Sequence, residues 1–183
     1  KNKKINVKFI QDPCVDNKAK KNKIEIDGAK KANLRDAVSV TKFLYWLKNE
    51  MNIGKTNEIL AAKNLLNLRK RNKLFFSLSF ETISAFGKNS AIPHYRLSKK
   101  SNMKFSKNNI FLIDSGAQYY DGTTDLTRTV IIGKATKEQK DRFTRVLKGH
   151  IAIAKAVFNE NTRGSTLDHL ARKSLNNINC DYD

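Results

Sequence analysis

The sequence predicts an α+β protein in which helices cover an antiparallel sheet. Two segments with apolar residues at three- and four-residue steps come first, at about 27–47 and 56–71, and predict helices. Three segments rich in Phe, Ile, Val and Thr follow, and two more helical segments close the chain. Because turn signals rather than helices separate the strands, we expect the sheet to be antiparallel.

The N-terminal part of the chain is expected to contain a polar segment followed by two helices. Residues 1–25 are rich in Lys, and alternation over residues 5–9 fits a short edge strand. The first helix starts at about Asp27, and Thr56 followed by Glu58 supplies capping chemistry for the second. The residues expected on the buried face of the first helix are Leu34, Ala37, Val38, Leu44, Tyr45, Trp46 and Leu47.

Strands are expected at 74–83, 110–114 and 126–132, with turns at 87–89 and 121–122. A long amphipathic helix is then expected over 137–158. Its apolar stripe consists of Phe143, Val146, Leu147, His150, Ile151, Ala154 and Val157. Ser165 and Asp168 have the spacing of a capping box for a last, shorter helix.

Composition limits the classes of function. The 183 residues include 36 Lys plus Arg and 17 Asp plus Glu, a net charge of +19. Lys exceeds Arg and is spread along the chain, so the charge alone gives little support for a nucleic-acid partner. The longest apolar run, residues 43–47, is far shorter than the roughly 20 residues of a membrane span. Cys14 and Cys180 lie near opposite ends, which fits a reducing cytoplasm better than a disulfide framework or a catalytic thiol.

Chemistry concentrates in residues 112–132. Asp114 ends an apolar strand segment, and Asp125 opens the next one after a glycine-containing turn. If these segments form a hairpin, the two carboxylates can lie side by side and hold Mn²⁺, Mg²⁺ or a pair of ions. Both aspartates also fit ordinary turn or strand-end positions, and their spacing alone does not separate the two interpretations.

The complete string LIDSGAQYYDGTTDLTRT resembles the metal-binding hairpin of aminopeptidase P, the Xaa-Pro aminopeptidase of the pita-bread metallopeptidase family, in its larger three-domain type. The stretches LRDAVSVTKFLYWL, LSFETISAFGKNSAIPHY and TRVLKGHIAIAKAVF also match in order, and the resemblance covers residues 14–182. It implies a truncated pita-bread fold, with helices packed on a curved antiparallel sheet. Residues 1–25 would be a linker from a missing preceding domain, and 26–183 the N-terminal two-thirds of the catalytic domain.

The resemblance assigns roles to three residues. Asp114 matches the aspartate that binds one metal ion, and Asp125 matches the aspartate that bridges both ions. His94 matches an active-site histidine that helps to hold substrate and transition state. His150 matches a helix position without a catalytic role and is expected to be a packing residue, and His169 is expected on a helix surface.

By this resemblance the parent protein is a cytoplasmic metallo-aminopeptidase that releases the N-terminal residue from X-Pro peptides with a metal-activated hydroxide. Its cofactors would be two divalent ions, with Mn²⁺ as the first candidate and Zn²⁺ or Co²⁺ as alternatives. A homodimer is expected for the full-length protein. The family also uses one histidine and two glutamates as ligands, and we find no match for these three in the sequence. We therefore expect the chain to be inactive alone. The alternatives are a degenerate pita-bread binding module and a prolidase-type dipeptidase.

Overall fold

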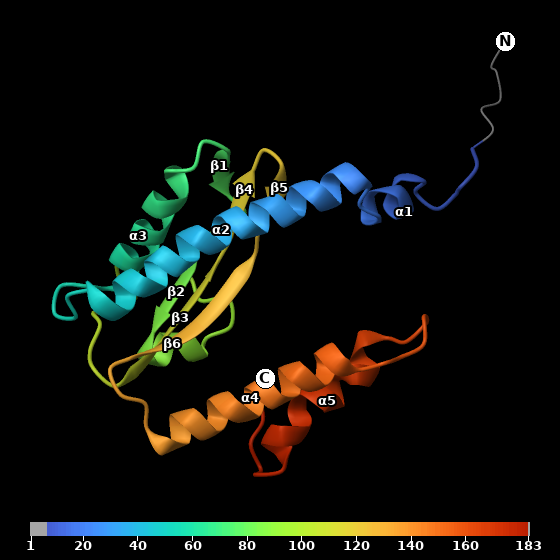
Figure 1. Cartoon of the computed structure of the whole chain (residues 1–183). Coiled ribbons are helices and arrows are strands. Elements are labelled where there is room, and N and C mark those ends of the chain that lie inside the picture. The colour runs from blue at the N-terminus through green and yellow to red at the C-terminus, as the bar shows by residue number, and fades with distance from the viewer. Residues whose placement is uncertain (1–6, 183) are drawn as a thin grey trace. The chain divides into compact units, whose positions relative to one another are not determined.

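The computed structural model describes residues 7–182 and confirms the α+β class (Figure 1). The chain divides into two compact units. One comprises Lys1–Ser106 with Ile110–Val130, and the other Lys107–Asn109 with Ile131–Asp183. The expected edge strand at 5–9 falls partly outside the described residues, and Val7, Lys8 and Phe9 are not in a strand.

Three helices open the first unit: α1 (Cys14–Ala19), α2 (Lys23–Asn49) and α3 (Glu58–Lys70). Helix α2 begins earlier than expected because Asn22 and Glu25 form a capping box, each side chain accepting the other residue's backbone N–H at 2.8–2.9 Å. The expected cap at Thr56 is wrong by one residue. Asn57 is the cap of α3, and its side chain accepts from the Leu60 N–H at 2.9 Å.

The buried face of α2 differs from the expected one. Leu34, Val38 and Tyr45 are 73%, 51% and 59% exposed, and Ala37 is exposed as well. The buried residues of the helix are Gly28, Ala32, Asp36, Ser39, Val40, Phe43 and Leu47. The centre of this buried face holds the carboxylate of Asp36 and the hydroxyl of Ser39. A prediction based on apolar residues alone therefore placed the buried face on the neighbouring side of the helix.

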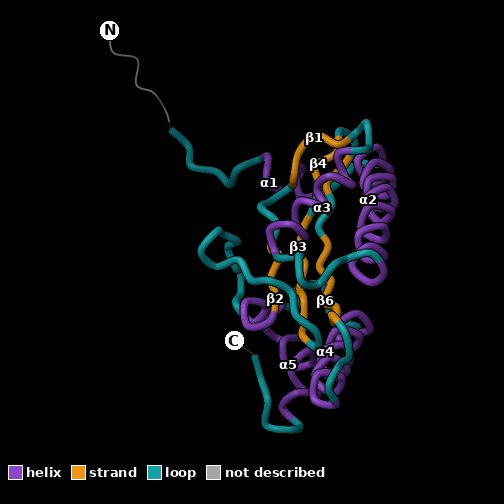
Figure 2. Tube along the Cα trace, turned by 90° about the vertical axis from the view of Figure 1, so that its left-hand side faces the viewer, coloured by secondary structure: helices purple, strands orange, loops and turns teal. Residues whose placement is uncertain are grey.

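The segment at 74–83 forms two strands rather than one. Strand β1 (Phe75–Leu78) and strand β2 (Ile83–Phe86) belong to different sheets (Figure 2). The orders are β1-β4-β5 and β2-β3-β6, with β3 at Asn109–Ser115, β4 at Ala117–Tyr119, β5 at Gly122–Thr123 and β6 at Leu126–Ile132. A 3-10 helix, η1 (Gly87–Ala91), follows β2. Helices α2 and α3 pack together, with α2 against β5 and α3 against β1 and β2 (Figure 1).

The remaining strands pass from one sheet to the other and back. Strand β3 (Asn109–Ser115) leads through Gly116 into β4 (Ala117–Tyr119), and β5 (Gly122–Thr123) then leads into β6 (Leu126–Ile132). Strand β2 pairs antiparallel with β3, so that Ile83 lies opposite Asp114 and Phe86 lies opposite Phe111.

Aromatic side chains form much of the core beside this sheet. The Phe105 ring lies 4.6 Å from that of Phe86 and 4.8 Å from that of Phe111, measured between centroids. Phe43 of α2 adds a contact to Phe111 at 6.4 Å. All four rings are at most 4% exposed, which anchors β2 and β3 beneath α2 and α3.

The second unit contains α4 (Lys137–Lys155) and α5 (Gly164–Asn176). The two helices approach closely at Gly149, where an added Cβ would lie 2.1 Å from the Ala171 carbonyl oxygen. Arg145 also donates to the Ser174 carbonyl at 2.9 Å.

Three details of this unit differ from expectation. Helix α4 ends at Lys155 instead of residue 158. No side chain caps α5, since Asp168 accepts from Arg172 at 2.7 Å rather than closing a box with Ser165. His150 is exposed rather than packed, and His169 is exposed as expected. The rest of the expected stripe is exposed too, namely Phe143, Val146, Leu147, Ile151 and Ala154 of α4 and Val157 beyond its end.

Among residues 7–182, no helix has both the length and the apolar content that crossing a bilayer requires.

Candidate metal centre

Asp114 is the penultimate residue of β3, where it pairs with Ile83 of β2. The side chain is partly buried, and its Oδ1 atom is buried with no hydrogen-bond partner among the described residues. A buried carboxylate oxygen without a donor is unfavourable unless a cation satisfies it. The orphaned oxygen therefore marks Asp114 as a candidate ligand.

Asp125 lies immediately before β6 and is exposed. Strands β3 and β6 are neighbours in one sheet, and the N–H of Asn108, the residue before β3, donates to the Ile132 carbonyl at the end of β6, with N···O 2.6 Å. The two strands therefore run antiparallel, which puts the Asp114 end of β3 beside the Asp125 end of β6. The sequence expectation of a simple hairpin is modified, because β4 and β5 intervene and pair in the other sheet.

These residues fit part of a divalent-metal site. Carboxylate oxygens are hard donors that suit Mn²⁺ or Mg²⁺, and Asp114 offers an oxygen that lacks a hydrogen-bond partner within residues 7–182. Across the described part of the chain, no three His, Cys, Asp or Glu side chains gather as a metal-binding group. The donors that the structure offers here are the two aspartates.

His94 lies in the loop after η1, and the structure does not gather it with the two aspartates into a ligand group of described residues. The side chain is exposed, and the backbone has φ 52°, a left-handed conformation uncommon for residues other than glycine. Such local strain persists only where surrounding contacts hold it. The contacts in this case come from its neighbour, Tyr95.

A buried carboxylate anchors the loop that carries His94. Glu58, at the start of α3, is 0% exposed and accepts four hydrogen bonds of 2.7–2.9 Å. The donors are the Phe86 N–H, the Asn89 amide, the Tyr95 hydroxyl and the Met103 N–H. Burial raises the pKa of Tyr95, so its hydroxyl remains a donor at neutral pH. One carboxylate thus holds both ends of the 87–103 segment.

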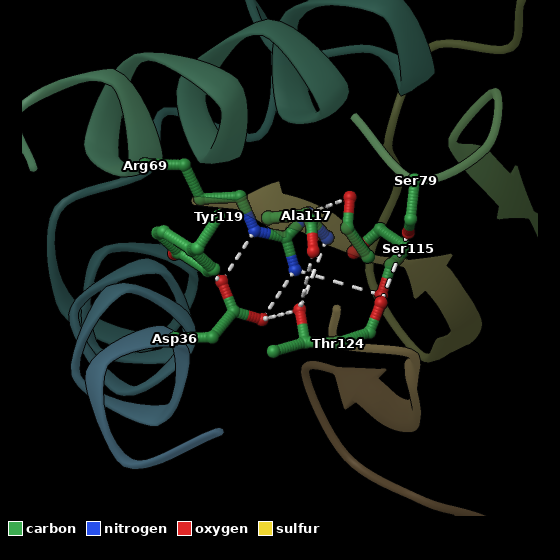
Figure 3. Close-up of polar contacts among 8 residues, drawn as sticks. Asp36, Arg69, Ser79, Ser115, Ala117, Tyr119 and Thr124 are labelled. Atoms are coloured by element: carbon green, nitrogen blue, oxygen red, sulfur yellow. Dashed lines mark hydrogen bonds and ion pairs between the residues drawn. The ribbon is translucent and has the colours of Figure 1, made fainter. Parts of the chain in front are cut away.

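A second buried carboxylate, Asp36, forms a polar cluster with Arg69, Tyr119 and Thr124 (Figure 3). Asp36 of α2 and Arg69 of α3 form a bidentate ion pair with both N···O distances 2.8 Å, and their side chains are 3% and 0% exposed. The Tyr119 hydroxyl donates to Asp36 at 2.9 Å, and the Thr124 hydroxyl donates to it at 3.0 Å. Burial, followed by the bond to Asp36, raises the pKa of Tyr119, which stays protonated as a donor.

A second ion pair, nearer the surface, joins α2 to the turn between β4 and β5. Arg35 donates to both carboxylate oxygens of Asp121, each at 2.8 Å, and the two side chains are 16% and 29% exposed. The hydrogen bond from Arg35 is the main cause that lowers the pKa of Asp121. Arg35 also lies over the Tyr119 ring, 5.0 Å from its centroid.

Sequence reasoning missed Asp36, Arg69 and Glu58. A signal for Asp36 exists: Ala32, Val40 and Phe43 stand four residues before it and four and seven residues after it, so the carboxylate lies within an apolar helical stripe. A charge in such a position needs a partner of opposite charge. That partner is Arg69, and it could not be predicted from the spacing of nearby residues because it depends on how α2 and α3 pack.

Comparison with known proteins identifies the family. Metallopeptidase family M24 matches residues 27–182, which is most of the chain. The chain belongs to this family. A probable Xaa-Pro aminopeptidase P from the fungus Coccidioides posadasii (strain RMSCC 757 / Silveira) is 43% identical over 178 residues, covering 96% of this chain and 29% of the relative.

Solved structures of the M24 family agree with this fold. An X-prolyl aminopeptidase from Caenorhabditis elegans, described as a cytosolic enzyme with a di-nuclear active site, superposes with a TM-score of 0.82 at 42% identity, covering 91% of this chain and 28% of that one. A prolidase from Thermococcus sibiricus gives a TM-score of 0.69 at 30% identity, covering 86% and 41%. The expected pita-bread fold and the likeness to aminopeptidase P are thereby confirmed. The chain spans less than a third of the fungal and nematode relatives.

Proposed function

We propose that this chain contributes metal ligands to an aminopeptidase that releases the first residue of peptides with proline in second position. The observation that carries the proposal is the Oδ1 of Asp114, which is buried without a hydrogen-bond partner in the described part of the chain, at the strand end beside Asp125. Membership of family M24 supplies the peptidase chemistry, and the Xaa-Pro specificity rests on the names of relatives at 42–43% identity.

In the proposed enzyme, Asp114 and Asp125 would hold two divalent ions. Mn²⁺ is the first candidate, and Zn²⁺ and Co²⁺ are the alternatives. Bound ions of this kind supply an activated water as the nucleophile near neutral pH. The protein's part is to present carboxylate oxygens from two adjacent strand ends in fixed positions. His94 would donate a hydrogen bond to substrate from a loop that Glu58 anchors through Tyr95.

We propose that further ligands come from outside residues 1–183, since two carboxylates alone bind a divalent ion weakly. The isolated chain should then bind Mn²⁺ poorly and cleave no peptide. Hydrolysis by the purified 183-residue chain, abolished by Asp114→Asn and therefore not caused by a contaminant, would contradict this part of the proposal.

The test of activity uses the full-length protein loaded with Mn²⁺ and a tripeptide X-Pro-Y, with X-Ala-Y as the comparison peptide. Release of the free first residue is followed by mass spectrometry. We expect cleavage of the proline peptide only, and loss of at least about 100-fold in rate for Asp114→Asn and Asp125→Asn. Asp121→Asn is the matched control, because this carboxylate lies in the same segment and pairs with Arg35 instead.

The outcomes separate three classes of protein. Cleavage of X-Pro-Y supports an aminopeptidase, whereas cleavage of the dipeptide X-Pro alone would indicate a prolidase, the activity named for the Thermococcus relative. Peptide binding without cleavage of either would indicate a degenerate binding module. Unchanged activity in both aspartate variants would overturn the assignment of ligands.

We further propose a cytoplasmic protein and, at full length, a homodimer. The cytosolic description of the nematode relative and the two free cysteines, Cys14 and Cys180, support the compartment. Cell fractionation checks the first proposal, and light scattering of the full-length protein checks the second.

A further inference from the structure

We propose that Asp36 and Arg69 are positioning residues for the two metal-binding aspartates. Their buried ion pair contacts the chain directly after Asp114 and directly before Asp125. This inference rests on the proposed function, because it gives a role to the ion pair only if the two aspartates bind metal.

On the Asp125 side, the link runs through the preceding residue, Thr124. Its hydroxyl donates to Asp36 Oδ2 at 3.0 Å and accepts from the Ala117 N–H at 3.0 Å. The Thr124 N–H in turn donates to the Ala117 carbonyl at 2.9 Å. Thr124 is 2% exposed, so Asp36 holds the Thr124 side chain, one residue before Asp125, in a dry environment.

On the Asp114 side, the link runs through two carbonyl groups. Arg69 reaches the Ser115 carbonyl oxygen at 3.5 Å and that of Gly116 at 3.4 Å, while its stronger bonds go to Asp36. These are long contacts, but the donor is a fully buried cation. Figure 3 shows the guanidinium between Asp36 and the Ser115 and Thr124 backbone.

Ser79 adds a link between the two sides. Its hydroxyl donates to the Thr124 carbonyl at 2.9 Å, and its N–H donates to the Gly116 carbonyl at 3.2 Å. Asp36, Arg69 and Ser79 therefore connect the residues after Asp114 to the residue before Asp125. A metal site needs its ligands held to within about 0.5 Å, and these bonds act on that separation.

Stability alone does not account for the pair. Burying two charges costs several kcal/mol per ion, and apolar residues of similar volume often replace such pairs without loss. The neighbouring Arg35–Asp121 pair joins the same helix to the turn between β4 and β5 with equally short bonds, yet among the described residues neither side chain hydrogen-bonds to Ser115, Gly116 or Thr124. It provides a natural control.

The experiment compares D36L/R69M with R35M/D121L in the full-length protein. Mn²⁺ affinity is measured by isothermal titration calorimetry, and unfolding is measured in chelator. We expect D36L/R69M, under conditions in which it is folded, to bind Mn²⁺ about 10-fold or more weakly than the wild type, the range typical of groups that orient metal ligands. R35M/D121L should bind as the wild type does.

Wild-type affinity in folded D36L/R69M, or equal losses in both double variants, would overturn the inference. If D36L/R69M does not fold, T124V and T124S decide, because only T124S keeps the hydroxyl bonded to Asp36. Weaker binding by T124V alone supports the inference, and equal binding by both overturns it. A wild type that binds no Mn²⁺ would instead overturn the proposed function, and that result is visible without any variant.

Discussion

Thr124 donates a hydrogen bond to Asp36 across 88 positions of sequence, with an O···O distance of 3.0 Å. The same carboxylate accepts from Arg69 and Tyr119, so one side chain of α2 connects α3, β4 and the link between β5 and β6. The candidate ligands Asp114 and Asp125 are the sequence neighbours of Ser115, which Arg69 contacts, and of Thr124. A helix that contributes no ligand thereby helps to set the geometry of the proposed metal centre.

Gly116→Ala should destabilise the protein. An added Cβ would lie 2.0 Å from the Thr124 carbonyl oxygen and 2.2 Å from the Ser79 hydroxyl, and the carbonyl belongs to a paired backbone that cannot turn away. We expect a loss of about 2 kcal/mol or more in the free energy of unfolding, measured with urea. Gly164→Ala, at a position with no atom within 4 Å, should change it by less than about 0.5 kcal/mol. Equal effects would contradict the close approach.

Glu58→Gln should destabilise the fold and loosen the His94 loop. All four partners of Glu58 are donors, so the amide NH₂ of glutamine would face a donor where a carboxylate oxygen now accepts. We expect a loss of about 2–4 kcal/mol in urea unfolding, and faster amide exchange over residues 87–103. Glu81→Gln, at an exposed position, should leave both unchanged. A wild-type exchange pattern in Glu58→Gln would exclude this carboxylate as the loop anchor.

Asp121 should make stability depend on pH in the acid range. Arg35 lowers the pKa of this carboxyl in the folded state, so the ionised form contributes stability above the unfolded pKa of about 4. That contribution is lost as the pH falls through the folded pKa. Because the side chain is 29% exposed, we expect Asp121→Asn to cost less than about 1 kcal/mol at pH 7 and nothing near pH 2. Parallel stability curves for variant and wild type over this range would rule out the ion-pair effect.

The sequence predicted those parts of the fold that depend on residues close together along the chain. Asp114 and Asp125 could be placed at strand ends because apolar segments stop or start at them. The division of 74–83 into β1 and β2 could not be foreseen, since the partner of β1 is β4, about 40 positions further along. The buried face of α2 was misplaced for a related reason: Asp36 is tolerated there only because Arg69 lies opposite.

The buried Oδ1 atom of Asp114 should lower the stability of the metal-free protein. Its Oδ1 is buried without a partner among residues 7–182, so Asp114→Asn, which removes the charge, should raise the stability of metal-free protein by about 1 kcal/mol. Asp125→Asn, at an exposed position, should not. The comparison uses thermal unfolding of the full-length protein, first in chelator and then with Mn²⁺.

With Mn²⁺ added, the wild type should become more stable than Asp114→Asn. Metal that binds only the folded wild type stabilises it by about 2.7 kcal/mol at 100 times the dissociation constant, a gain that Asp114→Asn forgoes. A carboxylate that is unfavourable without metal and favourable with it is what a ligand requires and what a turn residue does not. If Asp114→Asn instead destabilised the metal-free protein, and Mn²⁺ stabilised both forms equally, Asp114 would be structural and the proposed centre would lose its buried ligand.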